Sequence, residues 1–422
     1  MRSVIVRVHR WLGLTTALFL FVAGTTGAVI AWDHELDEWL NPQLYRARGV
    51  AGEAHDPVDL VAALEVAEPR LRVRYFPLRT KPGHSLLVMV EPRPDPATGR
   101  LHVLGYNQVA LDPVSGEVLG RREWGKAALD RENLLPFLYK LHYSLHIPEV
   151  WDMEPGVLLM GVVAIAWVLD TLIALWVSFP SLANWRQSFR LRWKAGGYRR
   201  VFDLHRSGGV WIFGLLLMLA VTSVAMNLRE PVMRPLVSLF SELTPSPFSV
   251  RTPVPLEQVA QPQLTLPALL EKARRQARIL GLEAPAGAVF LASSFGVYGV
   301  GLFEGDNSHG DGGLGNPWLY FDMHTGEFVG ADIPGRGTAG DIFLQSMYPL
   351  HSGRILGVPG RVLISLCGLA VAVLSVTGVL IWARKRKGRA QAARRVLPQK
   401  APIAATCSRD SEAVPSAAPR DR

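Results

Sequence analysis

Four long apolar runs organise the chain. They cover residues 11–32, 156–179, 208–227 and about 362–382, and Asp170 in the second run is their only charged residue. Each run is long enough to cross about 30 Å of hydrocarbon at about 1.5 Å per residue. No small-x-small cleavage site follows the first run, which favours a retained helix over a signal peptide. The pattern therefore predicts four transmembrane helices.

Basic residues gather before the first run, between the second and third runs, and after the fourth. Four crossings place these three segments on one side, so the positive-inside rule predicts that both termini are cytoplasmic. The two long connections then face outward. The basic residues are Arg2, Arg7 and Arg10, then Arg186, Arg190, Arg192, Lys194, Arg199, Arg200 and Arg206, and finally Arg384, Lys385, Arg386, Lys387 and Arg389.

Short motifs reveal an internal duplication. Three of them occur twice, in the same order and at similar spacing: HRWLGL at 9–14 and HRSGGV at 205–210, LDPVSGEVLG at 111–120 and FDMHTGEFVG at 321–330, and LYKLHYS at 138–144 and MYPLHSG at 347–353. We interpret the chain as two copies of a unit that consists of a helix, an outer domain and a second helix.

Each outer connection has an α+β pattern. A helical stretch, 56–69 or 266–280, precedes β-rich segments that end in a D-x-x-[ST]-G-E turn. In such a turn the aspartate, Asp112 or Asp322, accepts bonds from the following backbone, and the glycine supplies a positive φ. We therefore interpret the motif as hairpin chemistry. The Gly-rich stretch 305–315 is expected to be a disordered hairpin tip rather than a substrate flap.

The predicted fold is a membrane protein with four transmembrane α-helices in two tandem repeats and two α+β outer domains. Its expected segments are the N-terminus with helix 1 (1–32), the first outer domain (33–155), helix 2 (156–179), a basic cytoplasmic loop (180–207), helix 3 (208–227), the second outer domain (228–357), helix 4 (358–383) and a disordered basic cytoplasmic tail (384–422).

Composition narrows the class of protein. The 422 residues are 49% hydrophobic and only 19% charged, which is too apolar for an ordinary soluble enzyme. A net charge of +9 is compatible with nucleic-acid binding, but the basic residues flank the apolar runs, where they contact lipid headgroups. We therefore expect membrane lipid as a partner and no nucleic acid.

Cysteine usage limits the cofactors. The two cysteines, Cys367 in an apolar run and Cys407 near the C-terminus, exclude a disulfide framework, a CxxC zinc or iron–sulfur site and a CxxCH haem attachment. Any cofactor is therefore held by histidine, methionine or carboxylate side chains.

Four of the eleven histidines form equivalent pairs across the duplication. His9 and His205 lie at the cytoplasmic ends of helices 1 and 3, and His142 and His351 lead into helices 2 and 4 from the outer side. A ligand set produced by duplication comes in such symmetric pairs. The two pairs are about a bilayer thickness apart, roughly 30 Å, so each pair is expected to bind a centre of its own.

Paired imidazoles suit b-type haem. Two imidazole nitrogens on one iron give a low-spin centre for electron transfer, and no covalent attachment to cysteine is needed. Zinc fits less well, because neither pair has two further ligands nearby in the sequence. The alternative is that these histidines cap helix ends or lie among lipid headgroups.

Several neighbouring residues have candidate supporting roles. Arg10 and Arg206, beside the first pair, either neutralise haem propionates or merely follow the positive-inside rule. His146, four residues after His142, is the reserve outer ligand or a contact to substrate or propionate. Asp170 is expected to pair with a loop arginine, and a proton path or a quinol contact is the alternative.

The other histidines are expected to have no role at these centres. His34 follows helix 1 and has no counterpart in the other half, so it ranks lower. The remaining five are expected to be ordinary surface or turn residues: His55, His84, His102, His309 and His324.

Together, the HRxxG openings of helices 1 and 3, the D-x-x-[ST]-G-E turns and the L-H-x-x motifs before helices 2 and 4 resemble the PepSY-associated transmembrane family, also described as iron-regulated membrane proteins. The resemblance covers about residues 3–387. It implies a bacterial inner membrane, PepSY-like periplasmic domains and, in members that resemble this chain, dihaem reduction of ferric siderophores. By that resemblance His9, His205, His142 and His351 would ligate two haem b groups per chain.

The expected function is electron transfer across the inner membrane to a ferric chelate in the periplasm, which releases Fe(II). Reduction releases iron because hard oxygen chelators hold Fe(III) far better than Fe(II). The chain has no flavin-reductase segment, so the expected donor is quinol or a separate cytoplasmic reductase. The alternative is a non-redox PepSY-domain protein that binds or regulates a periplasmic partner. A transporter is disfavoured, because the spans offer almost no polar path.

Overall fold

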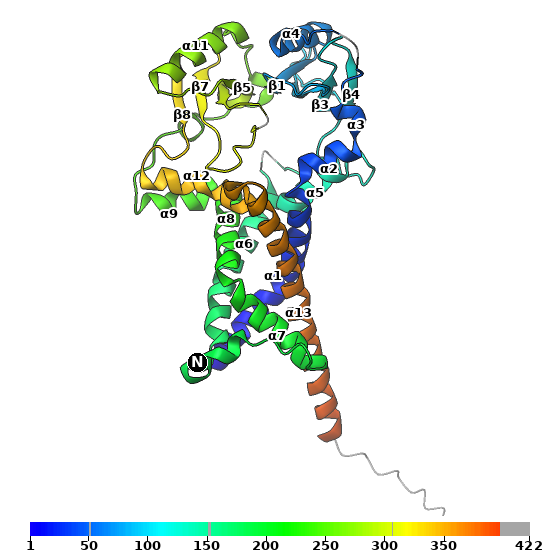
Figure 1. The fold of residues 1–422 in the computed structure, drawn as a ribbon, viewed down its shortest axis with the longest axis vertical. Coiled ribbons are helices and arrows are strands. Elements are labelled where there is room, and N and C mark those ends of the chain that lie inside the picture. Colours follow the sequence, from blue (N-terminus) through cyan, green and yellow to red (C-terminus); the bar gives the residue numbers. More distant parts are fainter. Residues whose placement is uncertain (50–51, 151–152, 306, 397–422) are drawn as a thin grey trace, which may run out of the picture.

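The computed structural model describes residues 1–49, 52–150, 153–305 and 307–396, and it consists of a helical stem beneath an α+β head (Figure 1). The helices are α1 (Arg2–Ile30), α2 (Asp33–Leu40), α3 (Pro42–Tyr45), α4 (Pro57–Ala67), α5 (Leu134–Ser144), α6 (Pro155–Ser178), α7 (Gly197–Trp211), α8 (Phe213–Asn227), α9 (Arg234–Ser238), α10 (Pro247–Val250), α11 (Leu266–Ile279), α12 (Ala339–Ser352) and α13 (Val358–Val396). The strands are β1 (Leu71–Pro77), β2 (Leu86–Pro92), β3 (Gln108–Leu111), β4 (Val118–Arg122), β5 (Ala286–Ala292), β6 (Val297–Leu302), β7 (Trp318–Asp322) and β8 (Phe328–Asp332).

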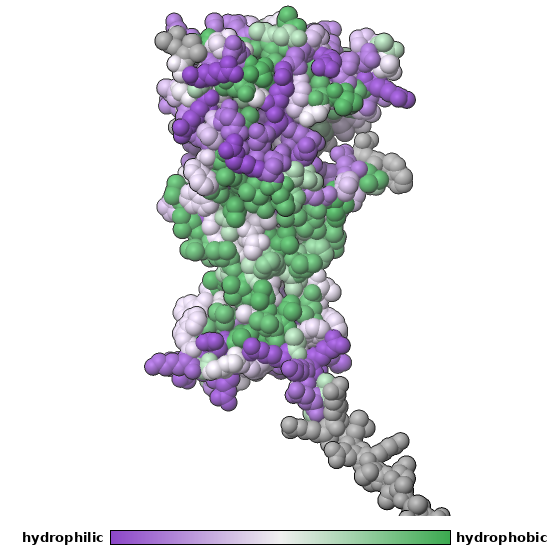
Figure 2. All heavy atoms as spheres, turned by 90° about the vertical axis from the view of Figure 1, so that its right-hand side faces the viewer, coloured by the Kyte–Doolittle hydropathy of each residue, from purple (hydrophilic) through white to green (hydrophobic). Residues whose placement is uncertain are grey.

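The stem has the surface of a membrane-spanning bundle. Helices α1, α6 and α13 are each long and apolar enough to cross a membrane, and α7 with α8 forms a bent pair that passes the same test. Figure 2 shows an apolar belt across the face of the stem that it presents, between a largely hydrophilic head and a hydrophilic opposite end. Exposed leucines such as Leu18, Leu169 and Leu366 belong to the stem helices. Lipid is the solvent that such a belt requires.

The third predicted span, 208–227, is divided between two helices, and its first residues belong to α7 rather than α8. Helix α7 ends at Trp211, α8 begins at Phe213, and the two are bent by 71°. The sequence changes there from an arginine-containing amphipathic segment to a wholly apolar one. An amphipathic helix stays at the membrane surface, whereas an apolar helix enters the hydrocarbon. The 15 residues of α8 rise about 22 Å.

The last helix is longer than its apolar run. Helix α13 continues to Val396, so the tail predicted as disordered from residue 384 begins as helix. Alanine, arginine and glutamine at 389–393 are good helix formers, which explains the extension. The remainder of the predicted tail, 397–422, lies outside the described residues.

The head contains one antiparallel sheet of eight strands in the order β4-β3-β2-β1-β5-β6-β7-β8. Strands from the two halves of the chain meet where β1 pairs with β5, with Phe76 opposite Val289. Helices α4 and α11, both predicted, pack in one hydrophobic core with the strands, through Leu64 and Leu269 among others. The two outer segments were expected as separate domains, but backbone pairing joins them into one layer.

The D-x-x-[ST]-G-E motifs form hairpin turns, as predicted. Asp112 Oδ1 accepts bonds from the amides of Val114 and Ser115 between β3 and β4, and Gly116 has φ +74°. Asp322 and Gly326, with φ +66°, repeat this arrangement between β7 and β8. Because a positive φ is strained for residues with a Cβ, glycine is required at this turn position.

A buried ion pair fastens the head to the stem. Arg122 at the end of β4 donates from Nη1 and Nη2 to the two carboxylate oxygens of Asp37, at 2.9 and 2.5 Å. Asp37 lies in α2, which follows α1 directly, and the Tyr45 hydroxyl donates to the same carboxylate at 2.6 Å. A bidentate arginine–carboxylate pair fixes orientation as well as distance. The sheet is therefore held in a defined position above the stem.

Glycines permit the closest helix crossing in the stem. A Cβ built on Gly24 of α1 would lie 2.5 Å from the carbonyl oxygen of Gly368 in α13, and a Cβ on Gly368 would lie 2.5 Å from the carbonyl oxygen of Gly24. Small residues at such crossings let helix backbones approach within a membrane. The α1–α13 contact therefore depends on the missing side chains.

We expect Gly24→Val to destabilise the stem by about 1–3 kcal/mol, because α1 and α13 must separate to admit the side chain. Gly214→Val in α8 is the matched control, since a Cβ at Gly214 meets nothing within 4 Å. Both changes place the same β-branched residue in a helix, so intrinsic propensity cancels. Thermal unfolding in detergent measures the difference, and equal shifts for the two variants would refute the close crossing.

Candidate functional site

His9 and His205 lie ring to ring at the end of the stem farther from the head. Their ring centroids are 6.3 Å apart, although they come from α1 and α7. His9 Nδ1 bonds Asp170 Oδ1 of α6 at 2.8 Å. His205 Nδ1 bonds the carbonyl oxygen of Leu374 at 3.0 Å and Thr377 Oγ1 at 3.1 Å, both in α13. The structure therefore brings this predicted pair together.

His142 and His351 form the second pair, nearer the head. Their centroids are 6.1 Å apart, with His142 on α5 and His351 on α12. His142 Nδ1 bonds the carbonyl oxygen of Ala23 at 3.0 Å and Thr26 Oγ1 at 3.1 Å in α1. His351 Nδ1 bonds Thr222 Oγ1 of α8 at 3.0 Å. The short helices α5 and α12 thus each place one imidazole against a stem helix.

These bonds fix the same tautomer in all four rings. A backbone carbonyl or a carboxylate only accepts, so Nδ1 of His9, His142 and His205 carries the hydrogen. The Thr222 hydroxyl already donates to the carbonyl oxygen of Met218 at 2.9 Å, so its oxygen accepts from His351. Among the described residues, Nε2 of none of the four rings takes part in a hydrogen bond. This is the state in which a histidine binds a metal, with its other nitrogen held by a hydrogen bond.

The two pairs lie near opposite ends of α1. His9 is on its third turn, whereas His142 contacts the helix at Ala23 and Thr26. The 17 residues between His9 and Thr26 rise about 25 Å. Two separate centres are therefore spaced across most of the membrane thickness.

Two glycines make room for the imidazoles. A Cβ on Gly27 of α1 would lie 2.9 Å from Cε1 of His142, and a Cβ on Gly378 of α13 would lie 3.1 Å from Cε1 of His205. Each glycine directly follows the threonine that contacts the same ring. The Thr-Gly step therefore both bonds the imidazole and lets it approach the helix backbone.

The two arginines that follow His9 and His205 leave buried donors without partners. Arg10 Nε and Arg206 Nε are both buried and have no hydrogen-bond partner among the described residues. A buried guanidinium donor without an acceptor is unfavourable. An anionic group beside the His9–His205 pair would satisfy both.

The sequence profile of the PepSY-associated TM region family matches residues 6–385. The chain belongs to this family. It is therefore a membrane protein, and the predicted family is confirmed. Among curated proteins, none matches the chain.

Each histidine pair offers only two protein ligands, which suits a metal cofactor that itself supplies most of the ligands of its metal ion. Within the described ranges, no group of three or more His, Cys, Asp or Glu side chains is placed to hold a bare metal ion. A metal–imidazole bond is about 2 Å long and the ring centre lies about 1 Å further, so two imidazoles on opposite sides of one ion have centroids roughly 6 Å apart. Both pairs have that spacing.

Asp170 does not pair with a loop arginine, so that prediction is wrong. Its carboxylate accepts from His9 instead, and its side chain is largely buried. Thr171, the counterpart of Thr377, donates to the carbonyl oxygen of Trp167. The two halves therefore differ: one orients its imidazole with a threonine and a carbonyl, and the other with a carboxylate.

The four-residue spacing suggested that His146 and His142 share a helix face, but they do not. Helix α5 ends at Ser144, and Leu145 and His146 have φ values of +55° and +54°. The His146 ring stacks on Phe137 at 4.4 Å, and its Nε2 bonds the carbonyl oxygen of Phe137 at 2.8 Å. His142 is thus the histidine that faces His351.

A third pair of histidines lies at the junction of head and stem and was missed. His34 at the start of α2 and His309 in the Gly-rich segment are both exposed, and their ring centroids are 6.2 Å apart. Protein atoms around the His309 ring, with the positive charge of Arg354, lower its pKa to about 4. The imidazole is therefore neutral at pH 7 and keeps a lone pair for a ligand.

The Gly-rich segment connects the antiparallel strands β6 and β7 and contacts Arg354, which follows α12. Arg354, three residues after His351, donates from Nη1 to Asp311 Oδ1 at 2.8 Å, and its carbonyl oxygen accepts from the Gly312 amide at 2.8 Å. The described residues 307–315 form turns between these two strands, which agrees with the predicted hairpin connection. Arg354 holds this segment, and His309 with it, beside the His142–His351 pair.

We expect Arg354→Ala to loosen residues 307–315, because the segment loses a charge-assisted bond of about 1.5–3 kcal/mol. Amide hydrogen exchange there should become faster by about tenfold or more. Arg251→Ala is the control, since it removes an Arg–Asp pair of similar length, to Asp322 at 2.9 Å, elsewhere in the same half. Unchanged exchange in 307–315 after Arg354→Ala would show that another contact holds the segment.

Proposed function

We propose that the chain is a dihaem b protein that moves electrons across the bacterial inner membrane and reduces ferric chelates, such as ferric siderophores, at the head end. The observation that carries the proposal is the recurrence of one arrangement. Each of two imidazole pairs has its Nδ1 atoms fixed and its centroids about 6 Å apart, and its Nε2 atoms take part in no hydrogen bond among the described residues. Paired neutral imidazoles at this spacing suit the two axial positions of haem iron.

The surroundings of the pairs fit haem better than a bare ion. His9 with His205 and His142 with His351 would supply the axial ligands, and the unpaired Nε atoms of Arg10 and Arg206 would meet propionates. Apolar stem side chains such as Leu216, Leu219 and Val371 provide a dry environment nearby. When bound, haem supplies a one-electron carrier whose potential depends on these ligands.

The direction of transfer follows from charge and from the position of the head. The basic residues of α7 and the end of α13 lie at the end of the stem away from the head (Figure 1). By the positive-inside rule that end, with both termini, is cytoplasmic and the head is periplasmic. Electrons would enter near His9 and His205 and leave near His142 and His351.

The reaction balances with a quinol or a separate cytoplasmic reductase as donor. A quinol gives up two electrons and two protons, and each electron converts one chelated Fe(III) to Fe(II). Oxygen-rich chelators hold Fe(II) much more weakly, so the ion is released. The protein's own residues orient the imidazoles, exclude water from the stem and position the chelate.

The junction cluster, defined as His34, His309, Asp311 and Arg354, is the surface that would receive the chelate. It lies directly beyond the His142–His351 pair, since Arg354 follows His351 by three residues. Its imidazoles are exposed and its arginine is held in place by Asp311. A chelate that docks there would stand close to the exit of the electron path.

Duplication accounts for the arrangement of both halves. The strand order runs outward from β1 and β5 in the same sequence of hairpins. His142 and His351 contact Thr26 and Thr222, which each lie 17 residues after the histidine of an HR motif. We infer that one unit, which consisted of a helix, an outer domain and a second helix, was duplicated. The Asp170–His9 contact is then a later change in one copy.

We expect the purified protein to show a bis-histidine b-type spectrum with about two haems per chain. His9→Ala or His142→Ala should remove about one haem each, because each breaks one pair only. Pyridine haemochrome quantification of the detergent-purified variants measures the content. His146→Ala is the control and should retain both. A colourless protein from haem-replete cells would favour the non-redox alternative, in which the head binds or regulates a periplasmic partner.

We expect a ferric trishydroxamate to reoxidise the dithionite-reduced protein anaerobically, with Fe(II) appearing in a chromogenic trap. The double change His34→Ala/His309→Ala should slow this reaction by about tenfold, the effect of losing about 1.4 kcal/mol of binding. Haem content should stay at the unmodified level, and His102→Ala should leave the rate unchanged. Equal rates in the double variant would remove the junction cluster from the proposal, and no reoxidation at all would remove ferric reduction.

A further inference from the structure

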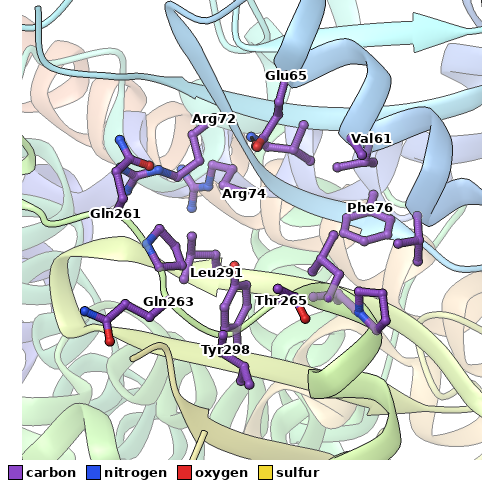
Figure 3. A pocket seen from close by; sticks show the side chains of 18 of the residues that line it. Val61, Glu65, Arg72, Arg74, Phe76, Gln261, Gln263, Thr265, Leu291 and Tyr298 are labelled. Atoms are coloured by element: carbon purple, nitrogen blue, oxygen red, sulfur yellow. Dashed lines mark hydrogen bonds between the residues drawn. The ribbon is translucent and has the colours of Figure 1, made fainter. Parts of the chain in front are cut away.

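A cavity of about 470 Å³ lies in the head, where the two halves of the sheet meet. Its lining comes from α4 and β1 of the first half and from β5, β6 and residues 261–267 of the second. Figure 3 shows Arg72, Arg74 and Gln261 toward one end of this cavity and Val61 and Phe76 toward the other. A volume of this size accommodates a small organic molecule. The electron-transfer proposal assigns the cavity no role.

Arg72 is a buried cation whose hydrogen-bonding edge is empty. Only 4% of its side chain is exposed, and its Nε and Nη2 atoms are buried without a partner among the described residues. Its nearest carboxylate is Glu91, 3.6 Å from Nη1 on the other side of the guanidinium. Burial lowers the pKa of Arg72, which is the signature of a cation that its surroundings do not fully compensate.

The unpaired edge of Arg72, formed by Nε and Nη2, is the edge through which arginine binds a carboxylate with two hydrogen bonds. In this same chain, Arg192 donates from Nε and Nη2 to the two oxygens of Asp203, at 2.6 and 2.8 Å. Nε–H and one Nη–H of a guanidinium point the same way and match the two oxygens of a carboxylate. Arg72 belongs to the cavity lining, and its corresponding atoms have no hydrogen-bond partner among the described residues.

Both nearby carboxylates already accept hydrogen bonds from other groups. Glu65 accepts from the Val73 amide at 2.7 Å and from Arg93 Nη2 at 2.8 Å. Glu91 accepts from the hydroxyl of Ser293, a residue of the second half. Arg93 Nε is a further buried donor without a partner, and Arg74 adds an exposed positive charge. At this end of the cavity the three arginines, Arg72, Arg74 and Arg93, therefore outnumber the two carboxylates, Glu65 and Glu91.

We propose that this cavity binds a small organic carboxylate, whose two oxygens meet Nε and Nη2 of Arg72 and whose apolar body lies along Val61, Phe76 and Leu291. An inorganic oxyanion would fill the arginine end only and leave the apolar walls uncovered. The site links α4 of one half to residues 261–267 of the other, so its occupant would also bridge the two halves of the head.

The first test uses 4-phenylbutyrate and its neutral amide as probes. Isothermal titration calorimetry on the full chain in detergent should show that the carboxylate binds, and that the amide binds about tenfold or more weakly, because a charge-assisted bidentate pair is lost. Inorganic phosphate should bind more weakly than the carboxylate. Equal binding of acid and amide, or no binding of the acid by folded protein at millimolar concentration, would overturn the proposal.

The matched variants separate the site from general charge effects. Arg72→Gln/Glu91→Gln removes the buried pair together, so no uncompensated carboxylate destabilises the sheet, and it should weaken phenylbutyrate binding about tenfold or more. Arg74→Ala should weaken it less, and Arg79→Ala, an exposed arginine outside the cavity lining, should leave it unchanged. Binding that survives loss of Arg72, or phosphate binding as tight as that of the carboxylate, would contradict this site. Haem content is unaffected either way, so the result is independent of the electron-transfer proposal.

Discussion

The bond from each histidine Nδ1 to a group on a stem helix is the constraint on which the rest of the stem depends. A half-buried imidazole can hold its hydrogen on either nitrogen, and only the fixed acceptor decides which. Here the carbonyl oxygens of Ala23 and Leu374, the hydroxyl of Thr222 and the carboxylate of Asp170 make that decision. They hold the rings as two pairs whose centroids are 6.3 and 6.1 Å apart. The short helices α5, α7 and α12 follow from this need, because they carry three of the rings to the stem.

Lipid requires an apolar surface and water requires a polar one, and separate parts of the fold provide the two surfaces. The stem buries its backbone polar groups in helices and separates the two imidazole pairs by about 25 Å, as a membrane requires. The head satisfies the backbone hydrogen bonds of its strands within one sheet and exposes charged groups to water. The Asp37–Arg122 pair and the Arg354–Asp311 pair connect the two parts. In the proposed function, the junction is where a water-soluble acceptor would come closest to the end of the electron path.

Sequence patterns predicted the elements whose signals are local. Apolar length revealed the long spans, the hairpin motif placed Asp112 and Asp322, and repetition selected the four paired histidines. Three-dimensional partners were harder: nothing near Asp170 in the chain points to His9, and His34 and His309 are 275 residues apart without a shared motif. The β1–β5 join, the bend before Phe213 and the unpaired edge of Arg72 likewise depend on packing that no short window contains.

An experimental structure of the protein purified from haem-replete cells tests the central claim most directly. The account predicts planar density between His9 and His205 and between His142 and His351, with Nε2 of each imidazole directed at the centre of the plane and its Nδ1 bond retained. Imidazole rings in mutual contact, with protein side chains filling the space beside them and no density between, would contradict it.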